Sequence, residues 1–231
     1  METVSPNTLY WILFIGITLL SWIVQASLQS KNKKFSKIAL PSGMTGADVA
    51  RKMLNDNGIY NVSVTSVRGT LTDHYNPSTK TVNLSEGVFH GNNIMAAAVA
   101  AHECGHAVQD MVGYAPLKMR SALVPVVSFA SNWVIWIILI GMLLINVFPS
   151  LMLIGIVLFA LTTLFSFITL PVEINASKRA IAWLDRSGVA DERTLPKAES
   201  ALKSAAYTYV IAAISSLATL FYYIAIYSRR N

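Results

Sequence analysis

The sequence predicts a mainly α-helical membrane protein with about four transmembrane helices and one small α+β region. Hydrophobic residues make up 54% of the 231 residues and charged residues only 13%, which is more apolar than an average soluble domain. Four apolar stretches each have about the 20 residues that a helix needs to cross a bilayer. The chain therefore divides into 1–27 (first transmembrane helix), 28–122 (α+β region), 123–171 (transmembrane hairpin), 172–206 (polar helical segment) and 207–231 (last transmembrane helix and tail).

The first apolar stretch, Asn7–Ala26, predicts a transmembrane helix rather than a cleaved signal peptide. No Lys or Arg precedes it and no Ala-x-Ala site follows it, although a signal peptide normally has both. Because basic residues favour the cytoplasmic side of a span, we expect residue 28 onward to lie in the cytoplasm and the short N-terminus outside. The basic residues that follow the stretch are Lys31, Lys33, Lys34 and Lys37.

The polar region after this span has the pattern of a small α+β fold. Gly46–Asn57 has apolar residues at helical spacing and precedes a glycine, which is a typical helix stop. Val62–Val67 predicts a short strand. Leu71–Tyr75 and Thr81–Leu84 flank a turn sequence and predict two paired strands. Thr81–Leu84 would suit a sheet edge that holds an extended peptide, although an ordinary hairpin is the simpler explanation.

The central motif of the chain is His-Glu-x-x-His, set in the alanine-rich stretch Ala96–Asp110, which predicts a helix. Four residues advance a helix by about 400°, so His102 and His106 project from one face. Two imidazoles at this spacing can bind one Zn²⁺. Glu103 lies beside that face, where its carboxylate can serve as general base toward a zinc-bound water without being a ligand. Two imidazoles and a carboxylate are costly to bury without a metal, so we expect one zinc ion per chain.

The single cysteine and the distribution of positive charge argue against a disulfide and against a nucleic-acid partner. One cysteine excludes an internal disulfide, and Cys104 lies about 200° around the helix from His102, where we expect a packed thiol rather than a third ligand. The net charge of +6 does not indicate a nucleic-acid partner, because the basic residues lie beside apolar spans and form no stripe with aromatic residues.

The helix that carries the motif also has a candidate cap. Either Asn92 or Asn93 is expected to cap its N-terminus.

The second half of the chain is again apolar. Leu123–Val147 and Leu151–Leu170 are each long enough to span, and a short connection makes them a membrane hairpin that returns to the same side. Tyr207–Tyr227 is the last span. With four spans, sixteen of the 18 basic residues would lie inside, which supports this orientation. The two that would lie outside are Arg229 and Arg230.

Glu173 is the candidate for the third zinc ligand. A catalytic zinc usually takes three protein ligands and keeps one position for water. Glu173 is the only acidic residue between Asp110 and Asp185, and it follows the membrane hairpin directly. The alternative is a carboxylate at a helix start that interacts with the helix dipole. The rival donors are Asp73, His74 and Glu86, which lie upstream in expected turns or strand ends.

Three segments resemble the YugP-type neutral zinc metallopeptidases of bacterial membranes: Leu71–Pro77, Ala100–Gln109 and Pro171–Ala180. The resemblance covers most of the chain and implies a zincin-like metallopeptidase region embedded in the membrane. It also implies zinc on His102, His106 and Glu173, with Glu103 as base. A more distant likeness joins these proteins to the HtpX and CAAX prenyl protease class. That class has an Asp four residues after the ligand Glu, where this chain has Ser177, so we expect no supporting role of that Asp to transfer to this chain.

Three further residues are weaker candidates for supporting roles. Asp110 lies one turn beyond His106 and could orient an imidazole, but a solvated acid at the helix end is the simpler expectation. His74 and Tyr75 could donate hydrogen bonds to a developing oxyanion. A turn histidine and a packed tyrosine are the ordinary alternatives for these two residues.

These observations together predict a membrane-embedded, zinc-dependent metalloendopeptidase. We expect an integral protein of the bacterial plasma membrane, with its catalytic site on the cytoplasmic side and with membrane-associated proteins or peptides as substrates. A zinc-binding membrane scaffold, or an inactive peptidase homologue, is the alternative; Glu103 argues against it, because a protein that only holds zinc needs no base there. A metal transporter would need polar ligands within the spans, and Asn132 alone does not meet that need.

Overall fold

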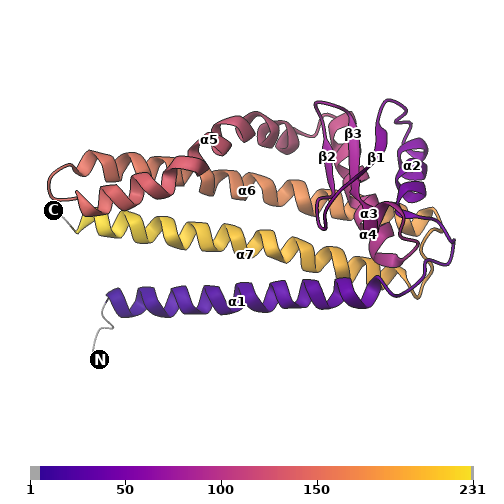
Figure 1. The fold of residues 1–231 in the computed structure, drawn as a ribbon, viewed down its shortest axis with the longest axis horizontal. Helices are drawn as coiled ribbons and strands as arrows, with labels where there is room; N and C mark the ends of the chain where they lie inside the picture. Colours follow the sequence, from indigo (N-terminus) through magenta and orange to yellow (C-terminus); the bar gives the residue numbers. More distant parts are fainter. Residues whose placement is uncertain (1–5, 230–231) are drawn as a thin grey trace. The chain divides into compact units, whose positions relative to one another are not determined.

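The computed structural model describes residues 6–229. Residues 1–5 of the predicted range 1–27 lie outside the described residues, as do residues 230–231, including Arg230, of the predicted range 207–231. The described chain is mainly helical and has one three-stranded sheet, which confirms the predicted fold class (Figure 1). In chain order the elements are α1 (Pro6–Phe35), α2 (Gly46–Asp56), β1 (Ser63–Val67), β2 (His74–Asn76), β3 (Thr81–Ser85), α3 (Glu86–Phe89), α4 (Ile94–Met111), α5 (Ala115–Leu143), α6 (Pro149–Arg186) and α7 (Leu195–Ser228).

Four helices of the described chain are long and apolar enough to cross a membrane, namely α1, α5, α6 and α7. The chain forms two compact units, and each of these four helices contributes residues to both. The apolar unit comprises Met1–Ile23, Met119–Leu170 and Thr208–Asn231. The mixed unit, which holds the sheet and the His-Glu-x-x-His motif, comprises Val24–Lys118 and Pro171–Tyr207.

In the apolar unit, α5 and α6 form a tightly packed hairpin. Ile138 and Met152 are buried where the two helices meet, and they belong to one hydrophobic cluster. A Cβ at Gly141 would lie only 2.7 Å from the Met152 Cα, so glycine is what allows the two backbones to approach this closely. Large apolar side chains elsewhere on α5, such as Phe129 and Trp136, are exposed. An exposed apolar surface of this kind suits a lipid environment.

The sheet of the mixed unit has the order β1-β3-β2, with β1 parallel and β2 antiparallel to β3. The predicted strand–turn–strand is therefore confirmed, but the first of its strands is shorter than Leu71–Tyr75. Leu71 has a φ of 59°, a left-handed conformation that cannot continue a strand. The suggested peptide-binding edge at Thr81–Leu84 is wrong, because β3 is central and is paired on both sides. β2 forms one edge of the sheet.

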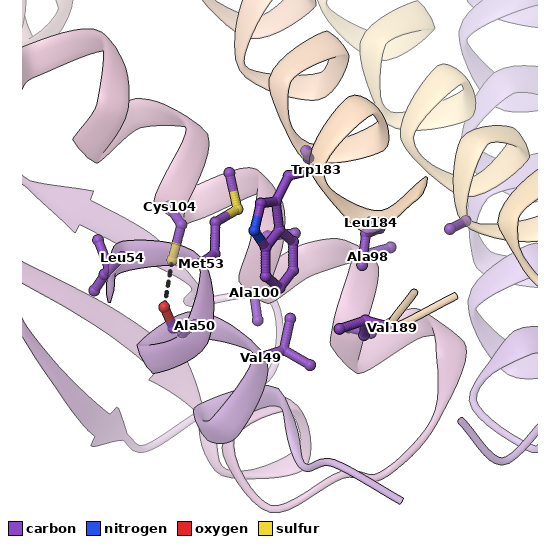
Figure 2. Packing of buried hydrophobic residues seen from close by; sticks show 14 of the residues in the cluster. Val49, Ala50, Met53, Leu54, Ala98, Ala100, Cys104, Trp183, Leu184 and Val189 are labelled. Carbon is purple, nitrogen blue, oxygen red and sulfur yellow. Dashed lines mark hydrogen bonds between the residues drawn. The ribbon is translucent and has the colours of Figure 1, made fainter. Parts of the chain in front are cut away.

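The hydrophobic core of the mixed unit gathers α2, α4 and α6 around a fully buried indole (Figure 2). Trp183 of α6 is 1% exposed and its Nε1 donates a hydrogen bond to Asp56 at 3.0 Å. The small side chains of α4, such as Ala98 and Ala100, leave room for neighbouring helices to come close. Cys104 is fully buried in this core, and its Sγ lies 3.5 Å from the Ala50 carbonyl oxygen. The packed thiol that the sequence predicts is confirmed.

Helix ends in the mixed unit follow the expected capping chemistry. Asn93 caps α4, since its side-chain oxygen accepts from the Ala96 amide at 2.9 Å, so Asn93 rather than Asn92 has this role. α2 has a capping box formed by Thr45 and Asp48. Its predicted end is confirmed, because Gly58 follows with a φ of 72°.

Candidate metal centre

The His-Glu-x-x-His motif lies in the middle of α4 and presents two imidazoles from one helix face. The ring centroids of His102 and His106 are 4.9 Å apart and the rings are nearly perpendicular. The side chain of His102 is 14% exposed, whereas that of His106 is 8% exposed. The pair is therefore shielded from bulk water but remains reachable on the His102 side.

Glu173 of α6 completes this group. Its Oε2 lies 3.2 Å from Nε2 of His102 and 3.7 Å from Nε2 of His106, and one ligand atom from each residue lies within 4.8 Å of the others. Three ligands about 2.0–2.1 Å from a tetrahedral zinc would be about 3.4 Å from one another. The spacing and the donor types, two neutral nitrogens and one carboxylate, therefore fit a zinc ion.

Within the described residues, this is the one group of three or more His, Cys, Asp or Glu side chains whose spacing suits a metal. The rival donors have other contacts. Asp73 accepts hydrogen bonds from the amide and hydroxyl of Ser85, and the ring of His74 contacts the Thr72 carbonyl oxygen at 2.8 Å. Glu86 is exposed at the start of α3.

Glu103 lies between the two histidines on α4 but is not part of the three-ligand group. It is 8% exposed, and its Oε2 accepts a hydrogen bond from the Tyr75 backbone amide at 3.0 Å. This amide belongs to the edge strand β2, so the sheet fixes the direction of the carboxylate. The arrangement thus combines three potential zinc ligands with one oriented carboxylate beside them.

Two comparisons with known proteins found matches to this chain. Residues 10–228 match the family described as "Putative neutral zinc metallopeptidase". This chain belongs to the neutral zinc metallopeptidase family. It is also 43% identical over 219 residues to a Bacillus subtilis (strain 168) protein described as "Putative membrane protease YugP", covering 93% of this chain and 96% of that protein. No solved structure matches.

Membership of the neutral zinc metallopeptidase family confirms the resemblance predicted from the three sequence segments. It supports zinc as the metal, since the family is named for it. The relative's description as a membrane protease agrees with the four helices that are long and apolar enough to span a bilayer.

The imidazole rings of His102 and His106 are both oriented by contacts to their Nδ1 atoms. Nδ1 of His102 lies 3.1 Å from the Ser177 hydroxyl, and Nδ1 of His106 lies 3.0 Å from the Gln109 side-chain oxygen. These contacts leave Nε2 of each ring directed at the shared Glu173 oxygen. Partners of this kind fix the ring orientation and the tautomer of metal-binding histidines.

Neither orienting residue was predicted from the sequence. We expected no supporting role at Ser177, which occupies the position where the HtpX class has an Asp, but its hydroxyl contacts the imidazole of His102. Gln109 is fully buried, and its amide nitrogen donates to the Val172 carbonyl oxygen at 2.8 Å and to Asn175 at 3.0 Å. The available signal was its place three residues after His106, where helical side chains meet.

Gly105 lets α4 and α6 approach closely enough for this site to form. A Cβ at Gly105 would lie 2.6 Å from the Ala176 carbonyl oxygen, which is closer than side-chain carbons come to backbone. Ala176 lies between the metal-site residue Glu173 and the orienting residue Ser177 on α6. The glycine inside the motif therefore sets the distance between α4 and the residues that α6 supplies.

The electrostatics of the site favour a cation. Burial opposes protonation of His106, but its hydrogen bond with Glu173 and the negative charges of Glu103 and Glu173 raise its pKa above the ordinary value. Two carboxylates thus act on one buried imidazole. A divalent cation would compensate the same negative potential.

Asp110 contacts neither histidine and is not a solvated acid either. It accepts hydrogen bonds from the Tyr75 hydroxyl at 2.6 Å and from the Lys80 ammonium group. Burial together with the Asp110 hydrogen bond and charge raises the pKa of Tyr75. Tyr75 is therefore neither a free oxyanion donor nor simply a packed ring; it links the edge strand to α4 at two points, its hydroxyl and its amide.

Proposed function

We propose that this chain is a zinc-dependent metalloendopeptidase that hydrolyses peptide bonds of membrane-associated proteins or peptides. The observation that carries the proposal is the convergence of His102, His106 and Glu173 beside Glu103, whose carboxylate is held in place by a sheet amide. Three ligands leave one position of a tetrahedral zinc for water, as catalytic zinc sites do.

The three proposed ligands would hold the zinc ion, and Glu103 would handle the proton. When bound at such a site, zinc supplies a water with a pKa of about 7 and polarises a carbonyl oxygen. Glu103 takes the water proton and delivers it to the leaving amine, as a positioned general base and acid. Its Oε2 accepts from Tyr75, so we assign the proton transfer to its other oxygen. Ser177 and Gln109 keep the imidazoles aligned during this cycle.

We infer that the site faces the cytoplasm. The motif and Glu173 lie in the two chain segments, 28–122 and 172–206, that together contain sixteen basic residues. Basic residues next to spans favour the cytoplasmic side. Peptide bonds near the cytoplasmic surface of the bilayer would then be the accessible substrates.

The test is a Glu103→Gln variant of the full chain, purified in detergent. Glu103 is not a proposed ligand, so the variant should retain zinc but lose casein hydrolysis by about 10²- to 10⁴-fold, the usual contribution of a positioned base. Glu199→Gln is the matched control, because Glu199 forms an exposed ion pair with Lys203 on α7. Near-normal hydrolysis by Glu103→Gln would remove Glu103 from the mechanism. A wild type that binds zinc but cleaves nothing would favour the zinc-binding scaffold.

A further inference from the structure

A cavity of about 180 Å³ lies beside the N-terminal half of α4, within the mixed unit. α4 contributes Met95, Ala96 and Val99 to its wall, and α3 contributes Val88. The loop before β2 contributes Leu71, which is 71% exposed and has a left-handed backbone conformation. Five of the thirteen lining residues are aliphatic, six are polar and two are glycines, but most of the exposed wall surface is apolar. Leu71 is the large exposed aliphatic side chain among them.

This cavity lies on the same face of α4 as the metal centre. Met95, Val99, His102 and His106 are separated by four, three and four residues, which is the spacing of one helical stripe. Val99 precedes His102 by three residues, or about 4.5 Å along the helix axis. Val99 is only partly buried, so a molecule in the cavity can contact it. A peptide bound at the zinc site would therefore have the cavity within reach of a neighbouring side chain.

The size of the cavity matches one amino-acid side chain. An apolar protein cavity of about 150 Å³ accommodates a benzene molecule. A space of about 180 Å³ therefore has room for a side chain of the size of Leu, Met or Phe. It is too small for a drug-sized ligand, whose pockets begin at about 300 Å³.

The one acidic side chain of the wall is already used by the fold. Both oxygens of Asp73 are 3.1 Å from the Ser85 hydroxyl, and one also accepts from the Ser85 amide at 2.7 Å. These bonds tie the loop before β2 to the end of β3. The carboxylate is thereby directed at Ser85, and the side-chain oxygen of Asn93 is engaged by the Ala96 amide. The aliphatic groups remain to contact a ligand, together with the polar wall residues Asn32, Ser36 and Thr70.

We propose that this cavity is a specificity pocket that receives one apolar side chain of the peptide substrate, next to the scissile bond. Val99 sets the size of the side chain that fits, because it lies on the stripe between the cavity and His102. The inference rests on the proposed peptidase function and adds a substrate preference to it. It predicts cleavage beside residues such as Leu, Met and Phe.

The first test maps cleavage sites of zinc-loaded, full-length protein on denatured casein by mass spectrometry. Val99→Ala should shift the preference toward larger side chains such as Phe and Trp. Val99→Phe should shift it toward Gly and Ala and lower kcat/KM for Leu-containing peptides about 10- to 100-fold, the usual effect of changing the fit of an apolar pocket. Val112→Ala is the matched control, because Val112 is exposed at the other end of α4 and is not part of the wall.

The second test measures binding without turnover. A peptide hydroxamate with an isobutyl side chain should bind zinc-loaded Glu103→Gln protein about 10- to 100-fold more tightly than its glycine analogue, and Val99→Phe should remove that difference. Equal binding of the two hydroxamates would overturn the inference whether or not the protein hydrolyses casein.

The outcomes separate this inference from the proposed function. Glu103-dependent cleavage with the same site preference in both Val99 variants would overturn the pocket and leave the peptidase function standing. A preference for Lys or Arg that Asp73→Asn abolishes would also overturn it, since the pocket would then read charge. Full activity of Glu103→Gln would instead contradict the proposed mechanism, and the hydroxamate comparison, made with wild-type protein, would still decide the role of the pocket.

Discussion

The side-chain oxygen of Gln109 lies 3.0 Å from Nδ1 of His106, and the amide nitrogen of the same side chain donates to the backbone of α6 at Val172. One fully buried residue therefore orients a proposed zinc ligand and connects the helix of the motif with the helix of Glu173. Neutral imidazole has a single N–H, so a Gln109 oxygen that accepts at Nδ1 leaves Nε2 unprotonated for the metal.

Gln109→Leu should therefore weaken zinc binding without removing a ligand. Leucine has similar size but cannot accept from His106 or donate to Val172, so it leaves the buried Nδ1 of His106 without its partner. Loss of such an orienting partner typically lowers metal affinity about 10- to 100-fold. Competition with a zinc chelator would measure the change, with Gln29→Leu at an exposed position of α1 as control. Equal zinc affinity in both variants would show that Gln109 has no orienting role.

Gly105→Ala should destabilise the mixed unit although alanine is the better helix former. The helix propensity gain of about 1 kcal/mol is opposed by the contact between the new Cβ and the Ala176 carbonyl oxygen, 2.6 Å apart, which forces α6 away. Overpacking of this kind costs about 1–3 kcal/mol and would also draw Glu173 away from the histidines.

The midpoint temperature of thermal unfolding and the zinc content of Gly105→Ala should therefore both be lower than in the wild type. Gly87→Ala is the control, because a Cβ there would meet no atom within 4 Å and Gly87 does not have a positive φ. If Gly105→Ala and Gly87→Ala had the same unfolding temperature and zinc content, Gly105 would not be required for the close packing of α4 on α6.

The sequence predicts the local features of the site better than the features that depend on distant segments. The length of the apolar stretches, the spacing of His102 and His106 and the Asn93 cap are all set by residues close together in the chain, and local chemistry governs them. The parallel pairing of β1 with β3 and the contact of Ser177 with His102 join residues 18 and 75 positions apart. No periodicity in the sequence encodes such pairs.

Asp110 should make stability depend on acid pH. Burial would raise its pKa, but hydrogen bonds from Lys80 and Tyr75 and the charges of Lys80 and Lys118 together lower it. Folding thus favours the ionised form, so the contribution of Asp110 is fully present above the ordinary aspartate pKa of about 3.9 and is lost as the pH falls through the lower folded value.

Asp110→Asn should accordingly be less stable than the wild type at neutral pH, with a difference that shrinks in strong acid. Chemical unfolding of the two proteins across pH would measure it, with Asp185→Asn at an exposed position of α6 as the control. A stability difference that stays constant with pH would show that the negative charge of Asp110 does not contribute to its contacts with Tyr75 and Lys80.

Cysteine labelling in intact cells should test the proposed orientation. Ser36→Cys and Glu192→Cys place thiols at exposed positions of the mixed unit, and they should react only with reagents that cross the membrane. The wild type is a suitable background, because Cys104 is fully buried and burial raises its pKa, which keeps it unreactive. Labelling of either variant by an impermeant reagent would place the mixed unit outside the cell.

The assignment of Glu173 as third ligand leads to the sharpest metal-binding prediction. Its Oε2 approaches both imidazole nitrogens, at 3.2 and 3.7 Å, and its side chain is 3% exposed. A carboxylate buried this deeply needs a compensating cation, and zinc would provide one. Glu173→Gln removes that charge and one of the three donors. Loss of an orienting partner typically lowers metal affinity by up to about 100-fold, and loss of a ligand should lower zinc affinity by more than that. Chelator competition compares it with Asp73→Asn, His74→Ala and Glu86→Gln, whose side chains lie outside the metal-spaced group. Full zinc occupancy in Glu173→Gln, with loss in any of these three, would move the third ligand to the sheet side of the site.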